Sequence, residues 1–191
     1  TGEIHAAHFY VSALGASGYP FVRAFPDESQ VSWSNAHVRA FEYYGGVPRI
    51  LVPDNCKTAV KSPKYYDPEM NPAYRELAEH YGLAVLPARV REPRDKSVVE
   101  QSVGWLETWL LGVIRNRRFF SFEELNRYVR ERLNQLVRRP FQKREGSRYS
   151  VFCEGDQPTL RPLPKNAFES ADMAVRRVPD NYHVEYKGFY Y

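Results

Sequence analysis

Cysteine is scarce in this sequence, and long apolar runs are lacking. The two cysteines, Cys56 and Cys153, lie far apart and have no CxxC or His-spaced partner. This spacing favours neither a zinc site nor a disulfide framework, and it predicts free thiols in a reducing cytosol. No apolar run approaches the roughly 20 residues of a membrane-spanning helix, so we expect no membrane partner.

Aromatic and basic residues are abundant instead. The 191 residues include 14 Tyr, 11 Phe and 3 Trp, and 43% of the chain is hydrophobic, which is enough for one sizeable core. The net charge of +4 is unevenly spread, because residues 1–87 carry −2, residues 88–148 carry +7 and residues 149–191 carry −1. Such a basic stretch is typical of proteins that bind a polyanion, although a solvated charged face has the same composition.

Hydrophobic periodicity predicts the order strand, strand, helix, strand, helix, strand, helix, helix. The first two strands form a hairpin around a GASG turn, and the helix that follows is capped by Asp27 or Ser29. The last helix opens with a capping box of Ser121 and Glu124. We expect the eight elements at residues 5–14, 19–25, 30–44, 47–53, 72–81, 83–87, 98–116 and 121–137.

The composition changes after Arg138, where proline and glycine become frequent. This texture predicts an extended linker, and the alternating residues near the end predict the first strands of a small β unit. We therefore expect three parts: a core over 1–138, a basic, proline-rich linker over 139–167, and the start of a small C-terminal β domain over 168–191.

Two carboxylates are candidates for a metal site. Asp54 follows the predicted strand 47–53, and Glu100 falls in the first turn of the predicted helix 98–116. Strand ends and helix starts at one edge of a sheet can hold two divalent metals about 3.5–4 Å apart for phosphoryl transfer. Each residue also has an ordinary explanation, since Asp favours turns and Glu favours a helix N-terminus. Glu107, further along the same helix, is assigned to solvent.

Basic residues flank the second carboxylate and recur after the last helix. The first group precedes Glu100 and would grip phosphates on either side of a metal site. The two groups are Arg89, Arg91, Arg94 and Lys96, and Arg138, Arg139, Lys143 and Arg144. The five histidines are scattered and are assigned no ligand role, and Trp105 and Trp109 are expected to pack against the core rather than stack on bases.

Four stretches together resemble a known family. The sequence is similar to the integrase-type, ribonuclease-H-like core of bacterial DDE transposases and retroviral integrases, and especially to IstA-type transposases of insertion sequences. The resemblance implies an α/β fold with a mixed sheet flanked by helices. The stretches are ASGYPFVRAFP (16–26), AFEYYGGVPRILVPDN (40–55), LAEHYGLAVLPARVREPRDKSVVEQSVG (77–104) and RPFQKREGSR (139–148).

The resemblance also implies functional roles. Asp54 and Glu100 match the second and third acids of the family's triad, which bind Mg²⁺ or Mn²⁺, with two ions in the complete enzyme. Asn55 is expected to hold the Asp54 carboxylate. The implied partners are double-stranded DNA, further copies of the chain and a helper AAA+ ATPase, in a bacterial cytoplasm at the nucleoid. The family's first Asp and its strand have no match in this chain.

We therefore expect a catalytic-core fragment of a DDE transposase. Its parent would cut and join DNA strands at insertion-sequence ends, and the 191 residues alone are expected to be inactive. Two alternatives stay open on the residues: a non-catalytic module for DNA binding or assembly, and a structure-specific nuclease on the same fold.

Overall fold

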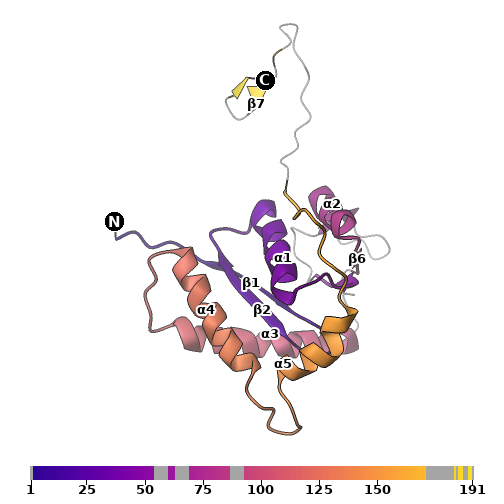
Figure 1. Ribbon diagram of the computed structural model, residues 1–191. Coiled ribbons are helices and arrows are strands. Elements are labelled where there is room, and N and C mark those ends of the chain that lie inside the picture. Colours follow the sequence, from indigo (N-terminus) through magenta and orange to yellow (C-terminus); the bar gives the residue numbers. More distant parts are fainter. Residues whose placement is uncertain are drawn as a thin grey trace.

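Short strand pairs and helices make up this α/β protein (Figure 1). The computed structural model describes residues 2–53, 60–62, 69–86, 93–170, 183, 185–186 and 189–190. The elements within these residues are β1 (His8–Ala13), β2 (Pro20–Phe25), α1 (Gln30–Tyr44), β3 (Ile50–Leu51), β4 (Val60–Ser62), β5 (Glu69–Met70), α2 (Pro72–Tyr81), β6 (Ala84–Val85), α3 (Pro93–Ile114), α4 (Phe122–Val137), α5 (Arg148–Val151), η1 (Phe152–Asp156), η2 (Gln157–Thr159), β7 (Glu185–Tyr186) and β8 (Phe189–Tyr190).

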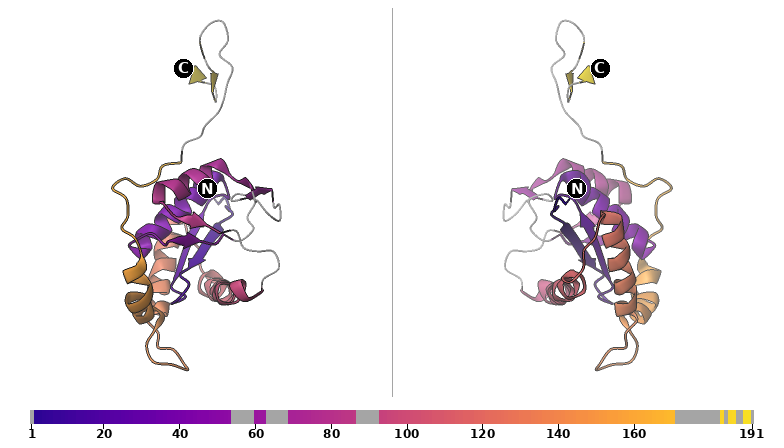
Figure 2. Two further views of the ribbon diagram at one scale, coloured as in Figure 1. Left: turned by 90° about the vertical axis from the view of Figure 1, so that its right-hand side faces the viewer. Right: turned by 90° about the vertical axis from the view of Figure 1, so that its left-hand side faces the viewer.

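The predicted hairpin is confirmed, and it forms the centre of the fold. β1 and β2 pair antiparallel from His8 opposite Phe25 to Ala13 opposite Pro20. Side chains alternate between the two faces of a strand, and in β2 the side chains of both faces are buried. Phe21 packs with residues of α1, whereas Val22 packs with residues of α3 and α4. Figure 2 shows α1 and α3 on opposite sides of the hairpin.

Helix α1 begins and ends where the sequence predicts. The Ser29 hydroxyl accepts a hydrogen bond from the Ser32 amide at 3.2 Å, and the helix ends at Gly45. The next residue, Gly46, has to be glycine for a different reason. A Cβ there would lie 2.7 Å from Leu160 Cβ and 2.8 Å from the Arg161 carbonyl oxygen, so a distant segment of chain packs directly on its backbone.

Strand β3 is shorter than predicted and runs parallel to β6. Ile50 and Leu51 pair with Ala84 and Val85. The expected strand over 47–53 shrinks because Val47 pairs elsewhere, in an antiparallel bridge to Arg161. This parallel pair packs with α1 and α2 on a cluster that contains fully buried side chains. The cluster consists of Val38, Phe41, Val47, Tyr74, Leu77, Ala78, Tyr81 and Leu83.

Asn126 of α4 covers the outer edge of β2. Its side-chain oxygen accepts a hydrogen bond from the Ala24 amide at 2.7 Å, and its side-chain nitrogen donates to the Ala24 carbonyl at 3.0 Å. One amide group thus replaces a neighbouring strand at this position and protects an edge that would otherwise be unpaired. The start of α4 follows the prediction only in part. Ser121 accepts from the Glu124 amide, but the Glu124 carboxylate accepts from Phe120 rather than from Ser121.

The predicted extended linker is not supported between residues 147 and 168. The chain forms α5, η1 and η2 there and packs back on the core. Phe152 is 5% exposed and stacks on Tyr19 with ring centroids 4.3 Å apart. The Asp156 carboxylate accepts from the Ser17 amide at 2.9 Å, and Val47 and Arg161 exchange two backbone hydrogen bonds. We call residues 149–168 the C-terminal strap.

The single mixed sheet of the prediction is confirmed only in its strand directions. Three antiparallel pairs and one parallel pair are present among the described strands, but they form four separate two-stranded sheets, β1–β2, β3–β6, β4–β5 and β7–β8. Within the same residues, no helix is long and apolar enough to cross a membrane.

Candidate metal-binding residues and nucleic-acid interface

The structure describes the two predicted carboxylates to different extents. Asp54 and its neighbour Asn55 lie outside the described residues. Glu100 lies in α3, where the backbone alone is described. The prediction that Glu100 sits in a first helical turn is wrong, because α3 begins at Pro93 and Glu100 is well inside it. Proline suits a first helical position because its φ is already helical and its missing N–H would have no partner there.

The strands of the parallel pair β3–β6 each end shortly before a group of predicted site residues. Parallel strands point the same way, so their carboxyl ends lie at one edge of the sheet, where α/β proteins place ligands. Leu51 ends β3 three residues before Asp54, and Val85 ends β6 four residues before Arg89. The segments that carry the first carboxylate and the first basic group therefore leave from the same edge.

The first basic group is described only in part. Arg89 and Arg91 lie outside the described residues. Arg94 and Lys96 lie in the first turn of α3, again as backbone alone. In the part of the chain whose side chains are described, no three His, Cys, Asp or Glu residues come close enough to hold a metal ion.

The second basic group is described in full and forms a projecting loop between α4 and α5, seen at the bottom of Figure 1. We call residues 138–148 the basic loop. Pro140 and Ser147 form an antiparallel bridge, and the Phe141 amide donates to the Gly146 carbonyl at 2.9 Å. Gly146 has φ +85°, a value that side-chain-bearing residues rarely adopt, so glycine permits the tight return of the chain.

Aromatic rings hold the arginines of this loop. The Arg138 guanidinium lies 4.0 Å from the ring centroid of Tyr149, and Arg144 lies 4.0 Å from that of Phe141. Arg139 and Lys143 are exposed on the same loop. A guanidinium stacked flat on a ring keeps its N–H edges free to bind phosphate oxygens in pairs. All four predicted cations therefore reach solvent from one short, internally bonded loop.

Arg148 is a further member that sequence reasoning missed. Its guanidinium lies 4.3 Å from the ring centroid of Trp105 and 5.6 Å from that of Phe141. Burial, and then the positive charge of Arg144, lower the pKa of Arg148. A partly buried cation beside a second cation favours an anionic partner. Arg148 lies in the basic stretch 88–148, but its ring contact is not visible in the sequence, because Trp105 is 43 positions away and the contact arises only from the fold.

Few carboxylates neutralise these cations. The ion pairs among the described residues are His8–Glu28 and Arg39–Glu42, and neither involves the basic loop. Two further predictions are confirmed: Glu107 is exposed to solvent, and Trp105 and Trp109 pack against the cluster that α3 and α4 share.

The buried histidine His37 belongs to the core. Its Nδ1 lies 2.9 Å from the Trp33 carbonyl oxygen and its Nε2 lies 3.3 Å from the Tyr74 hydroxyl. Burial lowers the pKa of His37 to about 4, so the ring is neutral at pH 7. The neutral ring donates to the carbonyl and accepts from the hydroxyl, which satisfies both nitrogens.

Proteins named as transposases are similar to this chain along its whole length, although no protein-family model matches it. One for insertion sequence IS1162 of Pseudomonas fluorescens is 43% identical over 191 residues, covering 100% of this chain and 34% of the relative. One for IS408 of Burkholderia multivorans is 43% identical, covering 97% and 36%. The transposase for IS21 of Pseudomonas aeruginosa is 28% identical, covering 98% and 47%. The chain thus spans about a third of the length of its first two curated relatives.

Solved structures of integrases share the fold. The catalytic core domain of BIV integrase superposes with a TM-score of 0.60 at 14% identity, covering 81% of this chain and 92% of that domain. A chain of the simian T-cell lymphotropic virus intasome, solved in complex with PP2A regulatory subunit B56 gamma, superposes with a TM-score of 0.58 at 13% identity, covering 91% and 55%. The protein therefore has the fold of an integrase catalytic core, and its relatives are named as insertion-sequence transposases.

Proposed function

We propose that this chain is part of the catalytic core of an IstA-type DDE transposase, whose parent cuts and joins DNA strands at the ends of an insertion sequence. The observation that carries the proposal is the combination of whole-length similarity to insertion-sequence transposases with an integrase-core fold. The net charge of +7 over residues 88–148 supports DNA as the substrate.

Asp54 and Glu100 are the proposed metal ligands. The donor set fits Mg²⁺ or Mn²⁺, because both are carboxylates and hard divalent cations take oxygen ligands. The common edge of β3 and β6, from which the chain leaves toward Asp54, also fits. When bound, the ions supply positive charge to the attacking and leaving oxygens of a phosphodiester. The resemblance requires a third carboxylate, and we assign no residue of this chain to it.

Other residues orient and grip the substrate. Asn55 is proposed to hold the Asp54 carboxylate by a hydrogen bond, as residues around metal ligands commonly do. The basic loop is proposed to hold DNA phosphates through Arg138, Arg144 and Arg148, whose guanidinium groups the neighbouring rings keep in place. The chemistry needs no covalent intermediate with the protein, since water and then a 3′-hydroxyl act as the nucleophiles.

The family resemblance extends the proposal to the whole protein. We propose that it assembles on DNA as a homo-oligomer, works with a helper AAA+ ATPase and acts in the cytoplasm at the nucleoid. The division of the chain at residues 138 and 168, with a β unit beginning after the second point, stays a prediction. Two rival functions are a non-catalytic DNA-binding module and a nuclease that hydrolyses without joining.

A strand-joining assay tests the catalytic proposal. A full-length transposase that contains this segment is incubated with a pre-cut element end and a plasmid, with Mg²⁺ or Mn²⁺. We expect Asp54→Asn and Glu100→Gln to abolish joining, and Glu107→Gln, an exposed carboxylate on the same helix, to retain it. Joining by the Glu100→Gln variant at the unsubstituted rate would exclude Glu100. Cleavage without joining would favour the nuclease, and binding without either would favour the module.

Metal binding by the 191-residue chain gives a second readout. Titration with Mn²⁺, followed by the loss of the free-ion electron paramagnetic resonance signal, measures binding without catalysis. We expect Asp54→Asn and Glu100→Gln each to weaken binding, and Glu107→Gln to leave it unchanged. Equal binding by all three variants would contradict the assignment of the ligands.

A further inference from the structure

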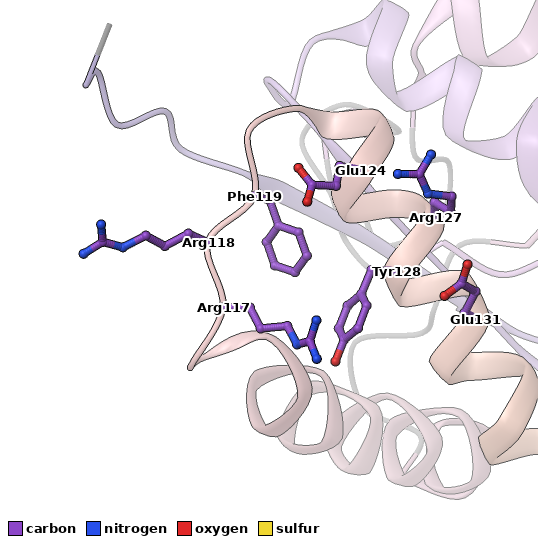
Figure 3. Close-up of a pocket in the computed structure, with 7 residues that line it drawn as sticks. All are labelled: Arg117, Arg118, Phe119, Glu124, Arg127, Tyr128 and Glu131. Carbon is purple, nitrogen blue, oxygen red and sulfur yellow. The ribbon is translucent and has the colours of Figure 1, made fainter.

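The connection between α3 and α4 forms a second cationic site, which the sequence analysis did not single out. A cleft of about 230 Å³ opens to solvent there. Three arginines, Arg117, Arg118 and Arg127, line it together with the rings of Phe119 and Tyr128 (Figure 3). The cleft lies between the end of one helix and the first turns of the next, away from the edge that β3 and β6 share.

Tyr128 organises the cations of this cleft. The Arg117 guanidinium lies 4.4 Å from the Tyr128 ring centroid, and Arg132, one turn further along α4, lies 5.1 Å from it. The Phe119 ring packs against the same tyrosine, with centroids 5.5 Å apart. A guanidinium in contact with a ring is ordered before it binds a ligand. Tyr128 is therefore a positioning residue for Arg117.

The carboxylates of the cleft do not neutralise its arginines. Glu124 accepts a hydrogen bond from the Phe120 amide at 2.9 Å and caps the start of α4. Glu131 is the second carboxylate of the lining. Neither forms an ion pair within 4.0 Å of Arg117, Arg118 or Arg127 in the described part of the chain. Each of these exposed guanidinium groups is therefore available to bind the paired oxygens of a phosphate.

The cleft and the basic loop lie at opposite ends of α4. Arg127 and Arg138 are eleven residues apart, which corresponds to about 16 Å along a helix axis and to nearly the same helical face. That distance matches about five base pairs of duplex DNA at 3.4 Å per step. A duplex that contacts the basic loop can therefore extend along α4 to the cleft.

We propose that this cleft binds backbone phosphates of DNA through Arg117 and Arg127, with Tyr128 positioning Arg117, as contacts separate from the basic loop. This inference rests on the proposed function, since it requires the protein to bind DNA. A second arginine group, Arg138, Arg144 and Arg148, lies at the other end of α4. Two separated cationic groups favour DNA over an acidic peptide, because a duplex carries phosphates at regular intervals along its length.

Fluorescence anisotropy of a labelled, mixed-sequence duplex tests the proposal on the 191-residue chain. At about 0.15 M salt we expect Arg117→Ala to weaken binding about fivefold and to reduce the log–log salt slope by about 0.9, the amount of one phosphate contact. Arg115→Ala is the matched control, because it removes the same charge from an exposed residue that does not line the cleft. We expect its affinity to change by less than about twofold, because Arg115 does not line the cleft.

Substitutions of Tyr128 separate positioning from net charge. Tyr128→Leu leaves the charge unchanged, yet we expect it to weaken DNA binding as much as Arg117→Ala does. Tyr128→Phe keeps the ring and should bind like the unsubstituted protein. The thermal unfolding midpoint of each variant verifies that it is folded. Tyr128→Leu binding at full affinity would overturn the positioning role.

Three results would overturn the inference. If Arg117→Ala and Arg115→Ala behave alike while substitution of Arg138 and Arg144 weakens binding, the cleft is not a DNA contact and the proposed function stands. If a polyglutamate peptide of equal charge competes as well as DNA, the cleft takes acidic peptides instead. If the unsubstituted chain binds no DNA at any salt concentration, the DNA-binding part of the proposed function fails together with this inference.

Discussion

Aromatic side chains do different work in two regions of this protein. Around α1 and the β1–β2 hairpin, rings contact other rings: Tyr19 stacks on Phe152 and on Tyr43, with centroids 4.3 and 5.6 Å apart. Along α4 and the basic loop, rings contact guanidinium groups, as in Arg138 on Tyr149 and Arg117 on Tyr128. The first region gains stability by excluding water, and the second orders cations while leaving their N–H groups in solvent.

Burial also changes the pKa of tyrosine hydroxyl groups in the core. Burial raises the pKa of Tyr10, Tyr43 and Tyr44, so each stays protonated across the physiological range. The Ser12 hydroxyl and the Tyr44 hydroxyl share a hydrogen bond of 3.0 Å. An aromatic-rich sequence therefore does not by itself distinguish a core from a binding surface, and the neighbours of each ring decide its role.

The largest effect is expected in the ring-to-ring region. Phe21, a residue of β2, is 2% exposed and packs against α1. Phe21→Ala should lower the free energy of unfolding by about 3–5 kcal/mol, because the cavity it leaves is closed on all sides. Urea denaturation followed by circular dichroism measures the loss. A change below about 1 kcal/mol would mean that the aromatic core does not carry the stability assigned to it.

The next effect depends on pH. Burial lowers the pKa of His37 to about 4, below the value near 6.5 of an unfolded chain. The unfolded state therefore binds more protons between these values, so stability falls as the pH drops through this window, by on the order of 3 kcal/mol in total. Denaturation at a series of pH values measures the slope.

Two variants identify the group responsible for that slope. His37→Gln should be less stable at pH 7 but should lose the steep dependence between pH 6.5 and 4. His80→Gln should keep it, because His80 is exposed. A His37→Gln variant with the original slope would assign the acid sensitivity to other groups.

A smaller effect on stability is expected at the contact between α4 and β2, where the two regions meet. Asn126 on α4 makes two hydrogen bonds to Ala24 of β2. Asn126→Ala should cost about 1–3 kcal/mol, because it leaves a partly buried N–H and C=O without their partner. Asn134→Ala, at an exposed position of the same helix, is the control and should change stability by less than about 0.5 kcal/mol. Equal losses would show that only helix propensity had changed.

The smallest effect on stability, with a clear effect on binding, is expected in the ring-to-cation region. Phe141 contacts Arg144 and Arg148 at the edge of the basic loop. Phe141→Ala should lower stability by no more than about 1 kcal/mol, the size of exposed cation–π contacts. DNA affinity should nevertheless fall, because both guanidinium groups lose their orientation. Parallel denaturation and anisotropy measurements separate the two quantities, and an unchanged affinity would contradict the role given to these rings.

Local signals made much of the fold predictable. Alternation gave the hairpin, and the Ser29 cap and Gly45 bracketed α1 because capping depends on neighbouring residues alone. The predicted helix 98–116 begins five residues after α3 does, because hydrophobic periodicity alone does not indicate that Pro93 opens the helix, although proline favours a first helical position. The strap was missed because its contacts, such as Val47 with Arg161, link residues more than 100 positions apart.

The candidate site also has one part that the sequence predicts and one part that it does not. Asp54 and Glu100 came from strand and helix positions together with a family resemblance, and their pairing stays a prediction. The cations of the basic loop were found as a cluster in the sequence. Their aromatic supports were not, because Trp105 and Tyr149 reach those cations only through tertiary packing.

The C-terminal strap has a consequence for how the chain folds. The Ser17 amide in the first hairpin finds its partner only in Asp156, and Val47 finds its partner only in Arg161, so residues made earlier are completed by residues made more than 100 positions later. Contacts of such long sequence separation close large loops and slow folding. A nascent chain that has reached only residue 138 has all of the helices from α1 to α4 but leaves the ring of Tyr19 and the backbone of Gly46 uncovered. Until the strap has been synthesised and has packed, Tyr19 and the Gly46 backbone stay exposed. Such exposed surface favours aggregation or chaperone binding.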